Sequence, residues 1–431
     1  INPKLDKVVC DICFTKDINL TTISPNDTSD SRFNAMADRF HTQILPRIHN
    51  NVESLSVQAS LLQRILHSNN YPNLHKLTLL NLEMNMAFHI FNKKSLFIRT
   101  YKHQISHLTM TITDISCKKS KEITIGQTYV AIFSWLSNLQ YLDLDGIDGN
   151  LYSRRLLSGL SPTRCYSSTV AHLRIRIHNF DDCLCLLDGR LHQLHTLIVK
   201  LDYVRYSRII INNEDTLLKL KCFSLYINRP TVDFDNKVVP LLRRLSNMEK
   251  LTLSFRVRRR NSFIDGIYLS NEISKYMSHL HTFLFDIVSD DTTINVHPKP
   301  SSDDIRHTLI EGGYYADCYV DYYTNDIGRC HIYSLPFTIE RINYLTSRFP
   351  GGIFLHSHII EDEDLGRLIS KIAAIIMYAF IGITTLVTVG VDTKSLLAGI
   401  VITGFTIGFA LKEVATNFIS GIFLVINKPF I

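Results

Sequence analysis

The first pattern of apolar residues along the chain is a short unit, apolar-x-x-apolar-x-apolar, which recurs from Val52 onward. The alternation in its last three positions is typical of a short β-strand with one buried face. Successive units begin 22 to 34 residues apart. The units stand at Val52/Leu55/Val57, Leu74/Leu77/Leu79, Ile105/Leu108/Met110, Leu139/Leu142/Leu144, Val170/Leu173/Ile175, Leu194/Leu197/Val199, Leu220/Phe223/Leu225, Met248/Leu251/Leu253 and Leu280/Phe283/Phe285. The pattern therefore predicts a series of strands that share one apolar face.

Helical patterns separate these units, for example Leu61-Leu62-x-x-Ile65-Leu66 and Leu241-Leu242-x-x-Leu245. Neither a lone strand nor a lone helix can bury its apolar face, so we expect the units to stack into a solenoid. The spacing resembles that of leucine-rich repeats, although it slightly exceeds their usual period of about 20 to 29 residues. The asparagine typical of such repeats is nearly missing, since only Asn228 stands at the expected position. The resemblance is to irregular repeats, like those of F-box and leucine-rich-repeat adaptor proteins.

The second pattern is a pair of uncharged apolar runs, residues 372–391 and 395–411, near the end of the chain. An uncharged apolar run of roughly eighteen residues is long enough to cross a bilayer as a helix. The sequence therefore predicts two transmembrane helices. The predicted fold class is α/β, an irregular leucine-rich-repeat solenoid followed by an α-helical membrane segment.

Small residues in the second run stand four apart in two pairs, Gly399 with Thr403 and Gly404 with Gly408. Small residues at this spacing let a neighbouring helix approach closely in lipid. Phe405 and Phe409 are also four apart and form an adjoining stripe. Copies of such a helix, packed through the glycine face, would place two apolar rings around a common axis.

The segment from Gly404 to Phe430 resembles the pore helix of the small-conductance mechanosensitive (MscS-like) channels. The resemblance implies that Phe405 and Phe409 form the pore constriction, at positions where leucines are familiar in the family. It implies packing through Gly399, Thr403, Gly404, Gly408 and Gly421, and a pore exit at Lys412, Glu413, Asn417 and Lys428. It further implies a tension-gated ion pathway in a lipid bilayer, built from a homo-oligomer that is a heptamer in the family.

Both patterns together divide the chain into five predicted parts. These are a flanking segment (1–50), the repeat solenoid (51–300), a cap of the solenoid (301–360), a linker (361–370) and the MscS-like segment (371–431), which stops before the family's β-domain. Arg367 and Lys371 precede the first apolar run, and Lys412 and Lys428 follow the second. The positive-inside rule therefore predicts an integral membrane protein with a cytosolic repeat domain.

Charge and cysteine usage change this picture little. The net charge of +6 is modest for 431 residues and does not indicate a nucleic-acid partner. The only dense basic cluster, formed by Arg256, Arg258, Arg259 and Arg260, is interpreted as a solvated loop rather than a phosphate-binding patch. The nine cysteines are scattered and odd in number, which is typical of a reducing compartment.

Candidate catalytic chemistry is weak. The sequence has no glycine-rich phosphate loop, no Gly-x-Ser-x-Gly elbow and no His-Glu-x-x-His helix. Cys10-x-x-Cys13 lacks a second pair at zinc-site spacing, and the pairs His103/His107 and His192/His195 have no acidic residue between them. We therefore expect no enzyme activity, no cofactor and no metal.

Two functions remain as hypotheses. The first is a membrane protein with a mechanosensitive-type pore helix and a repeat domain that binds an unknown protein partner. The second is an interaction protein, such as an F-box-like ubiquitin-ligase substrate adaptor, whose hydrophobic tail is an anchor or the product of a gene-model fusion.

Overall fold

The computed structural model describes residues 15–21, 40–68, 70–112, 128–146, 166–204, 219–324, 326–339, 341–343 and 358–360. The chain divides into two compact units, Ile1–Ser334 and Leu335–Ile431. In the described part of the second unit, β13 (Arg341–Asn343) and β14 (His358–Ile360) pair in parallel. The predicted domain boundaries stay predictions. The remainder of this section concerns the first unit.

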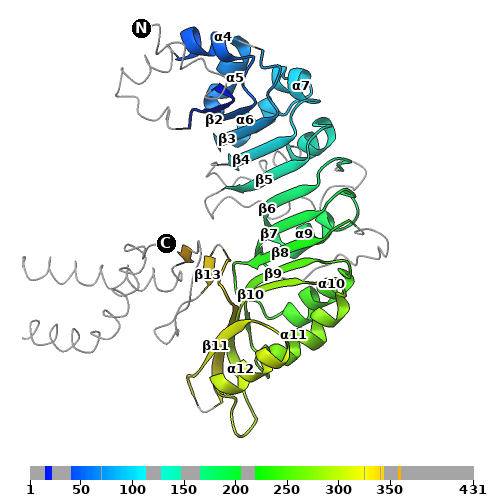
Figure 1. Ribbon diagram of the computed structural model, residues 1–431, viewed down its shortest axis with the longest axis vertical. Helices are drawn as coiled ribbons and strands as arrows, with labels where there is room; N and C mark the ends of the chain where they lie inside the picture. The colour runs from blue at the N-terminus through cyan, green and yellow to red at the C-terminus, as the bar shows by residue number, and fades with distance from the viewer. Residues whose placement is uncertain are drawn as a thin grey trace, which may run out of the picture. The chain divides into compact units, whose positions relative to one another are not determined.

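A single sheet runs through the first unit, with twelve strands among the described residues (Figure 1). Strands β1 to β10 are parallel and neighbour one another in sequence order, while β12 pairs antiparallel with both β10 and β11. The strands are β1 (Asp17–Asn19), β2 (Ser54–Gln58), β3 (Lys76–Leu82), β4 (His107–Ile112), β5 (Tyr141–Gly146), β6 (His172–Asn179), β7 (Thr196–Tyr203), β8 (Cys222–Ile227), β9 (Lys250–Arg258), β10 (Thr282–Thr293), β11 (Ala316–Tyr322) and β12 (Ile327–Ser334).

The repeated apolar units lie on β2 to β10 and explain why these strands pair in register. Leu55 pairs with Leu77, Leu77 with Leu108 and Leu108 with Leu142, so equivalent leucines form a continuous row across the sheet. All of these leucines are fully buried. Because side chains alternate between the two faces of a strand, the row places every second residue of each strand on one apolar face.

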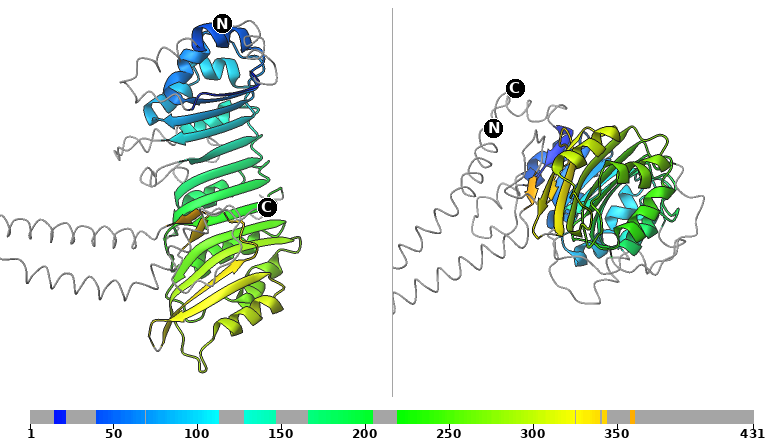
Figure 2. Two further views of the ribbon diagram at one scale, coloured as in Figure 1. Left: turned by 60° about the vertical axis from the view of Figure 1, so that its left-hand side comes forward. Right: turned by 90° about the horizontal axis from the view of Figure 1, so that it is seen from below.

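The helices cover this apolar face, as both views in Figure 2 show. Their bounds are α4 (Leu45–Ile48), α5 (Ala59–Ser68), α6 (Met84–Ile90), α7 (Leu96–Tyr101), α9 (Phe180–Leu186), α10 (Val239–Arg244), α11 (Gly266–Glu272) and α12 (Ser302–Glu311), with single turns η1 (Phe40–Ile44), η2 (Phe234–Val238) and η3 (Ser274–Tyr276). Their apolar side chains and the strand leucines form one core cluster. Gly266 allows α11 to touch α12, since a Cβ there would stand 2.0 Å from the backbone oxygen of Thr308.

The edge strand β11 is protected by the start of α12. The backbone N–H of Val320 donates to Ser302 Oγ (2.9 Å), and that of Cys318 donates to Asp317 Oδ1 (2.8 Å). An exposed edge with unpaired N–H groups would invite pairing with another chain. Side chains already occupy these two donors, so the open edge of β11 is poorly suited to adding a strand.

The fold class predicted from the sequence is wrong and is corrected to a mixed α/β fold with a twelve-stranded sheet. Within the described ranges, no helix has the length and apolar character needed to cross a membrane. The longest of these, α5 and α12, have ten residues each, or roughly 15 Å at the helical rise, about half of a hydrocarbon core. The predicted transmembrane helices and the integral-membrane location are withdrawn accordingly. The apolar runs 372–391 and 395–411 lie outside the described residues.

Candidate functional site: the polar face of the sheet

The face of β2 to β10 opposite the helices is polar, and we call it the polar face. Its first row follows the register of the strands. It consists of Ser54, Lys76, His107, Tyr141, His172, Thr196, Cys222, Lys250 and Thr282. Lys76, His172 and Lys250 are exposed, and most of the others are half-buried. This row at the amino ends of the strands is therefore accessible to a partner.

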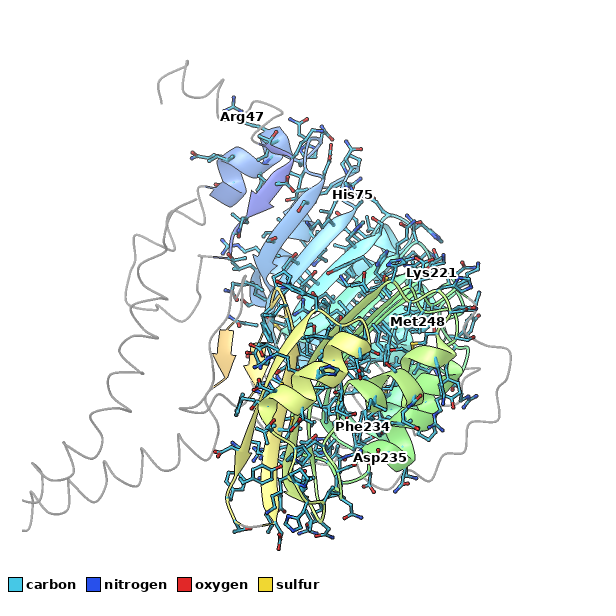
Figure 3. All side chains as sticks on the ribbon, turned by 60° about the horizontal axis from the view of Figure 1, so that its bottom comes forward. Arg47, His75, Lys221, Phe234, Asp235 and Met248 are labelled. Carbon is cyan, nitrogen blue, oxygen red and sulfur yellow. The ribbon has the colours of Figure 1, made fainter. Side chains whose placement is uncertain are left out.

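Five neighbouring rings form what we call the ring ladder: His107, Tyr141 and His172 of this row, with His75 and His195, which directly precede β3 and β7. His107 and Tyr141 stack, whereas the other neighbouring pairs are tilted or edge-on. The ring centroids of His107 and Tyr141 lie 5.6 Å apart and nearly parallel. The other successive pairs lie 5.9 to 6.4 Å apart. Figure 3 labels His75 on this rim together with Lys221, which forms an ion pair with Glu249.

The environment keeps the centre of the ring ladder uncharged. Burial, followed by the nearby His75 and Lys76, lowers the pKa of His107. Burial and His195 lower the pKa of His172 in the same way. Both imidazoles therefore remain neutral at pH 7, because their pKa values lie below the ordinary histidine value of about 6.5. The centre of the ladder therefore offers flat, uncharged rings.

A second feature, which we call the arginine cluster, lies at the carboxyl ends of β9 and β10. Arg256, Arg258 and Arg329 surround the carboxylate of Asp290. Asp290 Oδ2 accepts from Arg256 Nε (2.9 Å), from Arg256 Nη2 and from Arg258 Nε (3.1 Å). Asp290 Oδ1 accepts from Arg329 Nε (2.9 Å) and from the hydroxyl of Tyr323 (3.1 Å). One buried carboxylate thus holds three guanidinium groups.

The backbone around this cluster explains how Asp290 reaches its partners. The register of β10 against β12 shifts between Ser289 and Thr292, which is a β-bulge. Asp291, inside the bulge, has φ 48° and Arg259 has φ 58°, and the N–H of Arg259 donates to Asp291 O (3.2 Å). Bulges re-aim side chains, and non-glycine residues with positive φ tend to gather at functional sites.

Charge dominates the titration of Asp290. Burial alone would raise the pKa of its carboxyl, but the hydrogen bonds and charges of Arg256 and Arg329 outweigh burial and lower that pKa well below its usual range. In the opposite direction, burial and the Asp290 charge raise the pKa of Tyr323. Asp290 is therefore ionised and Tyr323 is neutral under ordinary conditions.

A buried pair lies beside the arginine cluster on β10 and β12. His331 Nε2 and Asp286 Oδ1 are 2.6 Å apart, and both side chains are fully buried. The hydroxyl of Ser254 donates to Asp286 Oδ2 (3.1 Å). The three residue types are those of a hydrolytic triad, but here the serine hydroxyl donates to the carboxylate and not to the imidazole that would have to act as its base. The arrangement fastens β9, β10 and β12 together.

Asn228, the one residue that matches the asparagine position of the repeats, takes part in a third polar group. Its Nδ2 donates to Asp202 Oδ1 (2.8 Å). Arg176 Nη2 lies 3.6 Å from the same oxygen, and His178 Nδ1 lies 3.5 Å from the other carboxylate oxygen. The asparagine therefore joins two neighbouring strand ends through a carboxylate.

The sequence-predicted site residues and the observed clusters barely coincide. The predicted pore residues, from Gly399 to Lys428, lie outside the described residues and stay predictions. The interpretation of the arginines as a solvated loop is wrong for Arg256 and Arg258, which lie on β9 and bind Asp290. The pair His103/His107 also separates, because His103 contacts Ser137 Oγ (2.6 Å) while His107 joins the ring ladder. In the described ranges no group of three or more His, Cys, Asp or Glu could hold a metal ion.

One signal in the sequence could have revealed the ring ladder. A histidine or tyrosine stands at the start of β4, β5 and β6 and directly before β3 and β7. Stacked strands bring equivalent positions side by side, so a ring at the same place in successive units predicts a row of rings.

Comparison with known proteins supports only part of the chain. No family model matches it. A relative, the small-conductance mechanosensitive channel MscMJ of Methanocaldococcus jannaschii, is 32% identical over 96 residues, which cover 20% of this chain. The chain spans about a quarter (27%) of the length of that relative. This partial similarity supports an MscS-like segment, while the leucine-rich-repeat and F-box part of the resemblance receives no support from the comparisons.

Proposed function

We propose that the first unit is an interaction module whose polar face binds a protein partner through the ring ladder. The observation that carries the proposal is the row of five neighbouring rings: three at the starts of β4, β5 and β6, on the face that the helices leave uncovered, and two directly before β3 and β7. The proposal assigns no catalytic step.

The rings are not needed for the core. The buried leucines already form the apolar face, and His107, Tyr141 and His172 alternate with them along the strands. Aromatic side chains are enriched at the centres of protein interfaces, where they contribute large contact area with few torsions to immobilise. The exposed Lys76 and Lys250 flank the row and favour a partner segment that carries carboxylates beside an apolar contact.

The test compares two double variants of the full chain. H107A/Y141A removes the centre of the ring ladder, whereas H307A/Y315A removes an exposed histidine and an exposed tyrosine around α12. The immobilised chains are incubated with extract of the source cells, and bound proteins are quantified by mass spectrometry. We expect a partner retained by the wild type and by H307A/Y315A to fall at least about ten-fold with H107A/Y141A, because interface hot spots cost about 2 kcal/mol or more.

Equal retention of every specific partner by H107A/Y141A and the wild type would show that the ring ladder is not the contact. Circular dichroism of both variants provides the control for folding, since neither pair of side chains belongs to the core.

We infer a second candidate, a channel-related function, from a different observation. It rests on the partial similarity to MscMJ, which is named as a small-conductance mechanosensitive channel. In this proposal, copies of the chain associate through the glycine-rich segment 399–421, as a heptamer by the family resemblance. Phe405 and Phe409 then close the conducting path by excluding water from it.

Ion flux through vesicles prepared with the full chain tests this candidate. F405S/F409S is expected to raise the resting ion leak several-fold, because serine hydrates a constriction that phenylalanine keeps dry. Phe380→Ser, outside the glycine-rich segment, is the control for loss of a phenylalanine and should leave the leak at the wild-type level. A resting leak that is identical in F405S/F409S and the wild type contradicts the channel-related function.

A further inference from the structure

The arginine cluster carries more positive charge than its carboxylate neutralises. Arg256, Arg258 and Arg329 all donate to Asp290, so the cluster itself keeps an excess of positive charge. Two other acidic residues stand near it. Asp321 is opposite Arg329 in the register of β11 and β12, and Asp291 is beside Arg259. Among the residues that the structure describes here, the four arginines outnumber the three aspartates.

The hydrogen bonds to Asp290 engage only the Nε atoms of the Arg258 and Arg329 guanidinium groups. Among the residues that the structure describes, their Nη nitrogens donate no hydrogen bond, and Arg329 otherwise lies over the ring of Tyr323 at 5.3 Å. A guanidinium presents five donors in a rigid fork, so each of these two side chains has two terminal nitrogens to offer.

The geometry separates a buried anchor from an accessible rim. The side chains of Asp290 and Arg256 are each 5% exposed, whereas those of Arg329 and Arg258 are 17% and 40% exposed. Asp290 therefore holds both outer guanidinium groups through their Nε atoms, and Arg258 is the more exposed of the two. The bulge at Asp291 and the positive φ of Arg259 hold the supporting backbone in place.

We infer that Arg258 and Arg329 bind a phosphate group. Guanidinium forks match the oxygen spacing of phosphate and form paired, charge-assisted hydrogen bonds with it. The shared carboxylate pre-orients both side chains, so binding does not need to order two long, free arginines. Phosphate is favoured over a monovalent carboxylate ligand because two adjacent guanidinium groups suit an anion with two charges. The inference does not depend on the proposed partner-binding function.

The experiment measures phosphate binding to the full chain by isothermal titration calorimetry at low ionic strength. The probes are inorganic phosphate and O-phospho-L-serine. The variants are R258Q/R329Q, which removes both forks, and R258Q, which changes only the more exposed side chain and keeps the test valid if the double variant does not fold. Arg99→Gln is the matched control, because Arg99 is exposed and lies on α7, outside the arginine cluster.

We expect saturable binding that weakens at least ten-fold in R258Q/R329Q, weakens measurably in R258Q, and stays within two-fold of the wild type in R99Q. Equal or tighter binding of phosphoserine indicates a phosphate ester on a larger molecule, whereas binding of inorganic phosphate alone indicates a free anion. The inference is overturned if neither probe binds saturably, or if R258Q and R258Q/R329Q bind as the wild type does.

Discussion

Asp290→Ala is expected to lower the free energy of unfolding by about 3–5 kcal/mol, the usual result of removing one partner from a buried ion pair. The substitution leaves Arg256, which is 5% exposed, without the carboxylate that compensates its charge. It also releases Arg258, Arg329 and the Tyr323 hydroxyl. Urea denaturation of the full chain measures the change. Asp303→Ala is the matched control, because the Asp303 side chain is 90% exposed and its ion pair with Arg306 contributes little.

The same carboxylate predicts how stability depends on pH. Since the pKa of Asp290 is lower in the folded chain than its usual value of about 3.9, its stabilisation is complete above that value. The stabilisation is lost as the pH falls below about 4 toward the folded-state pKa, because the unfolded chain then binds the proton first. Asp290→Asn should therefore flatten the loss of stability below pH 4. An unchanged slope in Asp290→Asn, or an Asp290→Ala variant as stable as Asp303→Ala, would contradict this account of the cluster.

Much of the parallel sheet could be predicted from sequence because its signal is local. The alternation around Leu55, Leu108 and Leu197 marks a strand wherever it occurs, and the similar spacing of the units makes neighbouring strands pair. The strands without this signal were not predicted individually. β1 has only three residues, and β12 returns antiparallel through contacts that no repeat specifies. These elements depend on tertiary pairing, which the periodicity does not describe.

The clusters on the polar face were not predicted, for a physical reason. Asp290 lies 34 residues from Arg256 and 39 from Arg329, so the basic cluster in the sequence gave no sign of its carboxylate. One local signal was present, since Arg256 and Arg258 alternate with the buried Phe255 and Val257 as strand residues do. The apolar runs near the end of the chain predicted membrane helices from hydropathy alone. These runs lie outside the described residues, and no helix among the described residues has the length to cross a membrane.

The buried pair of Asp286 and His331 leads to the second large prediction. Asp286→Ala is expected to lower the free energy of unfolding by about 3–5 kcal/mol, because it leaves a fully buried imidazole without the carboxylate at 2.6 Å. Adding His331→Ala should cost less in the Asp286→Ala background than in the wild type, since its contact with the Asp286 carboxylate is already lost there. The double-mutant cycle should give a coupling energy of about 1–3 kcal/mol, in the range found for residues in contact.

The exposed pair of His307 and Glu311 is the matched control for this coupling energy. His307 Nδ1 lies 3.3 Å from Glu311 Oε1, and the two side chains are 74% and 61% exposed. A helical pair of this kind should couple by only about 0.2–0.5 kcal/mol. Both pairs join a histidine to a carboxylate, one fully buried and one exposed. A larger coupling energy for Asp286 and His331 would therefore be attributed to their burial and closer contact. If the coupling of Asp286 with His331 is no larger than that of the exposed pair, the buried pair does not hold β12 to β10, and the antiparallel end of the sheet is stabilised by its apolar contacts instead.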